Sequence, residues 1–339
     1  MAKQPLPTEA NSSSGALQID PDNWFGESTP EHLSGMLGIA QMLELDEVTQ
    51  IAIRHLDLEE SSSKLTNRLG AEATQLILGF KALELTREKA AHGQVESIRK
   101  MLLAFSQDLR VVFIYLASRL QTLRWVTQKE IVPETAWAQE ILEIDAALAN
   151  RLGIWQMKWE LEDLAFRIVN AAEYQEIASL LDKKRSQRQS FITEMVSILE
   201  AQLVASGVLG SVYGRPKHIY SIWRKMAGKS LSFANLYDVS ALRVLVADVK
   251  DCYAVLGLVH HIWRPVPREF DDYIARPKPN GYQSLHTVVM NAEDIPLEIQ
   301  IRTQEMHQQA EYGVAAHWRY KEAAPSTASS AAKQYEERI

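Results

Sequence analysis

The spacing of apolar residues divides the chain into two parts. From Ser34 to about Val204, apolar residues recur at intervals of three and four with few turn-forming residues between them, as in amphipathic helices. One such face consists of Leu142, Ile144, Leu148, Leu152, Trp155 and Trp159. This part is predicted to be a helical bundle, with its Trp and Met residues in the core.

The pattern changes after Gly207. Strand-like segments follow as ALRVLVADV from Ala241, SLHTVVM from Ser284 and PLEIQIRT from Pro296. One helical candidate, over residues 216–226, precedes these strands, and another, over residues 250–259, lies between the first and the second. In the last strand Leu297, Ile299 and Ile301 alternate with polar residues, so one face is predicted to be apolar and the other polar. The second part therefore reads as an α/β domain.

These patterns predict an α+β multidomain protein. Residues 1–23 are rich in Pro, Ser and Asn and are predicted to be a disordered tail. A helical domain with connecting helices is expected over residues 24–195 and the α/β domain, with a mixed sheet, over 196–322. Residues 323–339 have the Ala, Ser and Pro content of a linker.

Composition narrows the class of protein. The chain has 339 residues, a formal charge of −7 and a pI near 5.8, which argues against a broadly basic protein that coats nucleic acid. Its single cysteine, Cys252, excludes a disulfide framework and is expected to be a buried structural thiol. No apolar run approaches the length of a membrane span, and no signal peptide is evident. We therefore expect a cytoplasmic protein without a membrane anchor.

The segment GRPKHIYSIWRKM, starting at Gly214, separates into two faces when it is wound as a helix. Ile219, Ile222, Trp223 and Met226 gather on the apolar face. The opposite face carries Lys217, Ser221, Arg224 and Lys225. With a Pro suited to the first turn, the helix N-terminus would add its amide donors to that cationic face, which suits a polyphosphate. The alternative is a surface helix with solvated Lys and Arg side chains.

Two carboxylates could hold a metal ion. Asp238 lies just ahead of the nearly continuous apolar strand ALRVLV, and Glu298 lies on the polar face of PLEIQIRT. If they converge across the sheet, they offer the oxygen ligands that Mg²⁺ prefers. The alternatives are a turn residue for Asp238 and a wholly solvated sheet face for Glu298.

The stretch from Arg268 to His286, REFDDYIARPKPNGYQSLH, concentrates polar chemistry in one place. It begins with three acids, Glu269, Asp271 and Asp272. A loop rich in Pro, Asn and Gly follows, and it carries Lys278, Asn280, Tyr282 and His286. The Tyr ring is a natural platform for a nucleobase, and His286 could reach a phosphate or ribose; a hairpin connection with solvated charges is the alternative. None of the patterns GxxxxGKS, GxGxxG or HExxH occurs.

Taken together, GRPKHIYSIWRKM, LYDVSALRV, EFDDYIARPKPNGYQSLHTVV, EIQIRT and EYGVAAHWRYKE resemble the synthetase domain of the long RelA/SpoT homologues. The resemblance extends to the helical half, where RKMLLAFSQDLRVVFIYLASRL resembles part of the family's hydrolase domain. It implies a nucleotidyltransferase-like fold and transfer of pyrophosphate from ATP to the 3′-hydroxyl of GDP or GTP. Such phosphoryl-type chemistry needs positioning and charge neutralisation more than covalent catalysis.

The resemblance also implies roles for individual residues. Asp238 would bind Mg²⁺, and Glu298 would help to hold it or activate the 3′-hydroxyl. Arg215 would stack on the adenine, while the ATP phosphates would be bound by Lys217, Ser221 and Lys225. Tyr282 would stack on guanine, and the acceptor nucleotide or the transferring phosphates would be held by Lys278, Asn280 and His286.

The three acids sharpen the resemblance. Family members that synthesise without hydrolysing resemble EXDD at this position, which here is Glu269, Asp271 and Asp272. Bifunctional members carry a basic RXKD version instead. The acidic form implies the monofunctional RelA type and some preference for GDP.

The helical half departs from the family's hydrolase pattern, which binds a metal, usually Mn²⁺, through a His, a His-Asp pair and a later Asp. Our alignment places Gly35 at the first His, Leu56 at the His beside a retained Asp57, and Ser118 at the last Asp. His55 falls one residue early, and one residue rotates a helical side chain by about 100°. We therefore expect a degenerate HD-type domain without Mn²⁺, a pseudo-hydrolase that packs on the synthetase and regulates it.

The resemblance implies partners as well as substrates. Family members continue into a C-terminal region that engages the ribosome and uncharged tRNA, which is not contained in this chain; a homo-oligomer is left open. Two other functions compete with synthesis. A catalytically silent regulator that senses nucleotides would be free to lose its catalytic residues, and these are intact. A nucleotidyltransferase acting on nucleic acid is disfavoured by the acidic net charge.

Overall fold

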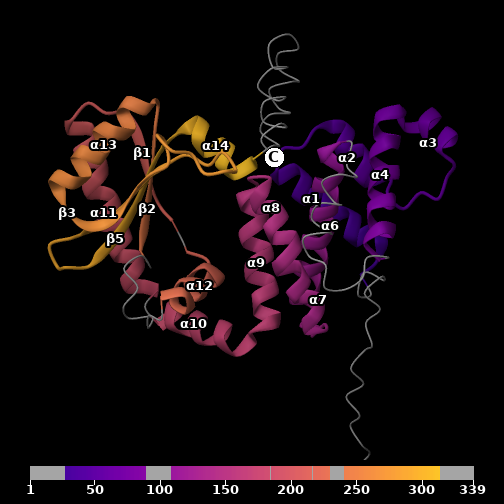
Figure 1. Ribbon diagram of the computed structural model, residues 1–339, viewed down its shortest axis with the longest axis horizontal. Coiled ribbons are helices and arrows are strands. Elements are labelled where there is room, and N and C mark those ends of the chain that lie inside the picture. The colour runs from indigo at the N-terminus through magenta and orange to yellow at the C-terminus, as the bar shows by residue number, and fades with distance from the viewer. Residues whose placement is uncertain (1–26, 89–107, 184, 216, 230–239, 314–339) are drawn as a thin grey trace, which may run out of the picture.

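A computed structural model describes residues 27–88, 108–183, 185–215, 217–229 and 240–313. The described residues form two lobes, one of helices alone and one built on a sheet, with α9, α10 and α12 between them (Figure 1). Among the described residues, no helix is long and apolar enough to cross a membrane.

The helical lobe is built around one buried helix, α6 (Leu109–Gln128), which is buried along most of its length. The side chain of Asp108 accepts a hydrogen bond from the backbone N–H of Arg110 and caps this helix. The helices before it are α1 (Thr29–Met42), α2 (Glu47–Arg54), α3 (Ser62–Leu69) and α4 (Ala71–Glu88). After it come α7 (Thr135–Glu140), the π-helical turn η2 (Ile141–Asp145), α8 (Ala146–Arg151) and α9 (Trp155–Val169). Together they enclose the larger hydrophobic core.

A mixed five-stranded sheet forms the second lobe, in the order β1-β2-β5-β4-β3. Its strands are β1 (Gly210–Gly214), β2 (Ala241–Val246), β3 (Arg264–Asp272), β4 (Leu285–Met290) and β5 (Pro296–Thr303). The central pair β2 and β5 is parallel and every other pair is antiparallel. The predicted α+β architecture with a mixed sheet is thereby confirmed.

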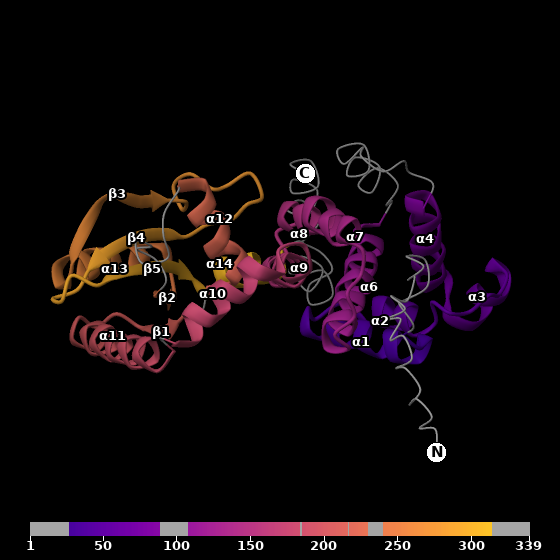
Figure 2. The same ribbon diagram turned by 90° about the horizontal axis from the view of Figure 1, so that it is seen from below.

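One face of the sheet is apolar and covered by helices. Side chains of α11 (Arg185–Ala205) and α13 (Val249–Ile262) share a core with Leu297, Ile299 and Ile301 of β5, and Cys252 is buried there. Figure 2 shows α11 lying across the sheet and joined through α10 (Ala171–Lys183) to the helical lobe. The domain boundary predicted between residues 195 and 196 falls inside α11, which packs with the sheet.

The opposite face of the sheet is polar, as the alternation in PLEIQIRT predicted, yet it is not solvated. Glu298, Gln300 and Arg302 are only 8%, 3% and 1% exposed, because α14 (Gln304–Tyr312), the loop before β4 and the helical lobe lie over this face. The helix α12 (Ile219–Lys229) lies beside it and packs on α9 and α10. A buried polar face of this kind needs partners for its charges.

Candidate functional site

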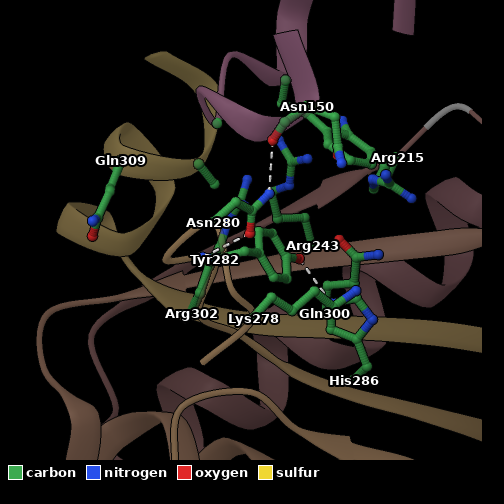
Figure 3. Close-up of a pocket in the computed structure, with 13 residues that line it drawn as sticks. Asn150, Arg215, Arg243, Lys278, Asn280, Tyr282, His286, Gln300, Arg302 and Gln309 are labelled. Atoms are coloured by element: carbon green, nitrogen blue, oxygen red, sulfur yellow. Dashed lines mark hydrogen bonds between the residues drawn. The ribbon is translucent and has the colours of Figure 1, made fainter. Parts of the chain in front are cut away.

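A cavity of about 110 Å³ opens over the polar face of the sheet, where the two lobes meet (Figure 3). Three residues of the helical lobe contribute to its wall: Asn150, Gly153 and Trp155. The sheet lobe contributes Arg215, Arg243, Lys278, Asn280, Tyr282, His286, Gln300 and Arg302. The structure thus brings together one predicted ATP-binding residue, Arg215, and all four predicted acceptor-binding residues.

Glu298 lies beside the lining residues His286 and Gln300 and is paired with one cation. The Nζ atom of Lys217 lies 2.5 Å from its Oε2, and His286 Nδ1 lies 3.6 Å from its Oε1. Gln300 Nε2 donates a hydrogen bond to the same Oε1 at 2.8 Å. Burial alone raises the pKa of the Glu298 carboxyl. The opposing effect of Lys217, His286 and Arg215 is larger, and the pKa falls to about 2. The carboxylate is therefore ionised at neutral pH.

His286 is uncharged at neutral pH. Burial lowers the pKa of its ring to about 4, against the opposing charge of Glu298. The hydroxyl of Tyr282 lies 2.8 Å from its Nε2, and a neutral ring that accepts this hydrogen bond carries its proton on Nδ1, toward Glu298. Tyr282, His286 and Glu298 thus form one chain of contacts.

The Tyr282 ring belongs to a small aromatic cluster. It meets Tyr273 edge-on at 6.2 Å and His286 at 5.7 Å between ring centroids. The ammonium of Lys278 lies 4.2 Å from the centroid of Tyr273 and 5.3 Å from that of Tyr282. Sequence reasoning missed Tyr273, although a Tyr directly after the EXDD acids was a visible signal.

The loop before β4 is fixed by its own backbone and by the helical lobe. Gly281 has φ of 77°, and its N–H donates to Lys278 O at 2.8 Å. Asn280 Oδ1 accepts from the N–H of Tyr282 at 3.2 Å, while its Nδ2 donates to the carbonyl of Asn150 in the helical lobe at 3.0 Å. The Asn280 amide thus ties the two lobes together at the cavity.

A larger cleft of about 520 Å³ lies on the other side of Arg215 and Arg243. Trp155, Trp159 and His218 contribute to its wall. The Arg215 guanidinium lies 6.0 Å from the centroid of the Trp155 ring. Trp155 and Trp159 are therefore not core residues as predicted, since they are only half-buried and face the sheet lobe.

The predicted ATP-phosphate segment is only partly assembled around the cavity. Lys217 contacts Glu298, but Lys217, Ser221 and Lys225 line neither cavity. The amides at the start of α12 were expected to face a phosphate. Instead Asp163 of α9 accepts hydrogen bonds there, from Ile219 N at 3.3 Å and Tyr220 N at 2.8 Å. The expectation of free amide donors was wrong, because the helical lobe supplies the anion.

Asp238, the other predicted metal ligand, lies outside the described residues. The strand that follows it begins at Ala241, whose partner in β5 is Glu298. The described residues contain no group of three or more His, Cys, Asp or Glu side chains that could hold a metal. The pairing of Asp238 with Glu298 stays a prediction.

The three EXDD acids differ in their surroundings. Asp272 Oδ1 accepts from the N–H groups of Ile274 and Ala275, and Tyr253 Oη donates to its Oδ2 at 2.9 Å, so this residue shapes the turn after β3. Asp271 pairs with His286 across the strands and bonds the Tyr273 hydroxyl. Glu269 lies further along β3.

Sequence reasoning missed a charged cluster on the polar face. Arg243 of β2 and Arg302 of β5 both contact Glu311 Oε1 of α14, at 3.0 Å and 2.9 Å. Burial and the charge of Arg302 lower the pKa of Arg243 to about 10. The signal was available, because Arg243 is the charged residue within the otherwise apolar ALRVLV.

The alignment of Gly35 with the first hydrolase His stays a prediction. A Cβ at Gly35 would meet the flexible end of the Gln121 side chain. His32, one turn earlier on α1, is fully buried, with Nε2 3.4 Å from Ser118 Oγ and Nδ1 2.9 Å from Glu27 Oε2. Because it lies beside Ser118, His32 is a second candidate for the first His position.

The remaining hydrolase positions lie where a metal would have few ligands. Leu56 is 7% exposed and packs in the core, and Asp57 is exposed. His55 Nδ1 lies 2.9 Å from the carbonyl of Ile51, within its own helix. Leu56 and Ser118 are the two positions that lack a ligand side chain.

Comparison with known proteins agrees with this division. Residues 214–325 match the family described as "Region found in RelA / SpoT proteins", and residues 20–155 match the HD domain. The GTP pyrophosphokinase of Escherichia coli (strain K12) is 49% identical over 286 residues, which are 82% of this chain and 38% of that protein. A probable guanosine-3′,5′-bis(diphosphate) 3′-pyrophosphohydrolase of Synechocystis sp. is 42% identical over 272 residues, 80% of this chain and 36% of that protein. The chain thus spans less than two fifths of these relatives.

Among solved structures, the small alarmone synthetase 1 from Bacillus subtilis bound to its product pppGpp matches with 22% identity and a TM-score of 0.36. That match covers 47% of this chain and 90% of the other.

Proposed function

Because the chain is a RelA/SpoT homologue with an N-terminal HD domain and a C-terminal synthetase domain, we propose that it transfers pyrophosphate from ATP to the 3′-hydroxyl of GDP or GTP. The products are AMP and ppGpp or pppGpp. The observation that carries the proposal is the buried, ionised Glu298 in contact with both Lys217 and His286, the second of which lines the smaller cavity. Such a site can neutralise and position phosphates on either side of one carboxylate.

The low pKa of Glu298 bears on its role. A carboxylate with a pKa of about 2 is a weak base, so it is better suited to holding a cation than to removing the proton of a hydroxyl. Its oxygens match the hard donors that Mg²⁺ takes, and Asp238 would be the second ligand. Bound Mg²⁺ would supply charge neutralisation at the transferring phosphates. Lys217 supplies positive charge to the same carboxylate.

The proposed binding site for the acceptor nucleotide, GDP or GTP, is formed by the loop before β4 and its aromatic cluster. Tyr282 would stack on guanine, with Lys278 and Asn280 toward its phosphates or ribose. His286 is neutral and can donate from Nδ1 without adding charge. Arg215, with Arg243 beside it, would face the adenine of ATP from the larger cleft.

Purified chain incubated with ATP, Mg²⁺ and either GDP or GTP provides the test, with nucleotides separated by ion exchange. We expect AMP and an alarmone in equal amounts. Glu298→Gln keeps the size of the side chain but removes its charge, and should lower kcat by about 100-fold or more; Asp238→Asn should do the same. Full turnover by both variants would refute the metal assignment, and alarmone-free wild-type reactions would refute the function.

Five finer features belong to the same proposal. The acidic EXDD residues support a monofunctional RelA-type enzyme with some preference for GDP, and Mg²⁺ is the proposed metal of the synthetase half. No Mn²⁺ is expected in the helical half, since two of four ligand positions hold Leu56 and Ser118. We place the protein in the cytoplasm. The length of the relatives supports a longer protein whose C-terminal region would engage the ribosome and uncharged tRNA.

A further inference from the structure

One face of α9 lies along the segment that carries the proposed ATP-binding residues. Trp155, Trp159, Asp163 and Phe166 are spaced by four, four and three residues, which places them on one side of the helix. Trp155 lies under the Arg215 guanidinium. Trp159 stacks on His218, with ring centroids 4.0 Å apart and planes 7° apart. This helix of the helical lobe therefore lies alongside the segment of the sheet lobe that contains Arg215 and His218.

The contacts continue into the first turns of α12. Phe166 meets the rings of Tyr220 and Trp223 at 5.4 Å and 4.8 Å. Between these aromatic pairs, Asp163 accepts the two backbone N–H groups of Ile219 and Tyr220. A carboxylate at a helix N-terminus satisfies orphan amides and favours the helix dipole. Asp163 thus caps α12 from another lobe, 56 and 57 residues away in sequence.

Apolar packing also contributes to the position of α12. It packs on α9 and α10 through a small cluster that contains Ile177 and Ile222. Upstream of α12, Arg215 N donates to Ala241 O of the sheet at 2.8 Å. Lys217 lies between this anchor and the Asp163 cap, and it reaches Glu298. The direction of α12 and the place of Lys217 therefore depend on the cap.

We propose that Asp163 is a positioning residue for the ATP side of the site, so that the helical lobe completes the ATP-binding surface of the sheet lobe. The inference rests on the proposed function for the identity of the nucleotide. It gives the helical lobe a part in synthesis that requires no hydrolytic chemistry. Asp163 acts through Arg215, Lys217 and α12, and the acceptor side around Tyr282 is built from other elements.

The test separates the two nucleotides. In Asp163→Ala both amides lose their acceptor, and we expect the KM for ATP to rise about tenfold, the cost of a lost cap. The KM for GDP should stay within twofold. Asp163→Asn keeps one acceptor oxygen and should weaken ATP affinity by about threefold, less than Asp163→Ala does. Glu173→Gln is the matched control, because Glu173 is an exposed acid on α10 that contacts Asn170.

A binding measurement makes the result independent of turnover. Titration calorimetry with a non-hydrolysable ATP analogue should give the same tenfold loss for Asp163→Ala and no change for Glu173→Gln. If the wild type makes no alarmone, the proposed function fails, yet analogue affinity still decides the role of Asp163. Should Asp163→Ala not fold, Asp163→Asn decides, with weaker ATP binding at unchanged GDP binding in support. Unchanged analogue affinity in a folded variant, or an equal loss for both nucleotides, would overturn the inference.

Discussion

At the scale of single residues, two buried carboxylates behave in opposite ways because their neighbours differ. Burial raises the pKa of both Asp163 and Glu298. Glu298 faces the cations Lys217 and Arg215, which outweigh burial, whereas the two amide donors on Asp163 do not, and its pKa is raised to about 6. Position in the sequence predicts neither outcome, since both depend on partners from other elements.

The raised pKa of Asp163 predicts a pH dependence of stability. An acid whose pKa is higher in the folded than in the unfolded state contributes stability that is present below the unfolded value and lost as pH rises through the folded value. For a rise from 3.8 to about 6, this loss amounts to roughly 2 to 3 kcal/mol between pH 4 and pH 7. Asp163→Asn cannot ionise, so its stability relative to wild type should increase over the same range, as measured by urea unfolding.

The groups around Asp163 do not obscure that measurement. His218 lies 3.7 Å away, but burial lowers its pKa to about 4, so it is neutral across most of the range. Lys158 and Glu162 of α9 pair with each other at 2.6 Å, and Tyr174 of α10 titrates only at alkaline pH, because burial raises its pKa above 10. Parallel stability curves for wild type and Asp163→Asn would show that Asp163 ionises as it does in an unfolded chain.

At the scale of elements, the apolar patterns predicted the three central strands and missed β1 and β3, the two strands at the edges of the sheet. β2, β4 and β5 coincide with the apolar segments picked out from the sequence. β3 was not predicted as a strand, because Pro265, Pro267 and its charged residues, which suit an exposed edge, give no apolar alternation. Arg268 there has φ of 69°, and the register with β4 shifts between Pro265 and Phe270. Edge strands carry little hydrophobic signal.

The loop before β4 gives a prediction that separates turn chemistry from ligand binding. Asn280→Ala removes the acceptor of the Tyr282 N–H and the donor to Asn150 O. We expect about 1 to 2 kcal/mol of destabilisation, and a rise of about fivefold or more in the KM for GDP because Lys278 and Tyr282 lose their support. The KM for ATP should be unchanged in steady-state kinetics.

The chain offers a matched control for this variant. Asn291, in the turn between β4 and β5, accepts from the N–H groups of Glu293 and Ile295 with its Oδ1. It makes the same kind of turn without lining either cavity. Asn291→Ala should cost similar stability and leave the KM for GDP unaltered. If Asn280→Ala and Asn291→Ala raised the KM for GDP equally, the loop before β4 would affect GDP binding only through the stability of the protein.

At the scale of the whole molecule, the motifs of the synthetase half were visible in the sequence, but the contribution of the helical half was not. Arg215, Tyr282 and His286 do gather in one cavity. The contacts of Trp155 and Asn150 with that cavity join residues 60 to 130 positions apart, and no local pattern encodes such pairs. Helical periodicity assigned Trp155 and Trp159 to the core of the helical lobe. A helix face that packs on another lobe has the same spacing of apolar residues as a face that packs in the core of its own lobe.

Long-range contacts also bear on the degenerate hydrolase site, where His32 of α1 lies beside Ser118 of α6. His32 Nδ1 contacts Glu27, while Nε2 points to Ser118, and a carboxylate behind a His is the usual support of a metal ligand. Adding Leu56→His and Ser118→Asp to the retained His32 and Asp57 should therefore create Mn²⁺ binding, seen as a rise in melting temperature with Mn²⁺ that the wild type lacks. A further His32→Gln substitution should abolish it. If Mn²⁺ raises the melting temperature of the wild type, the prediction that the site is lost is wrong. If Mn²⁺ does not change the melting temperature of the folded double variant, the assignment of His32 is wrong, because two restored and two retained ligands bind a first-row metal only if all four converge.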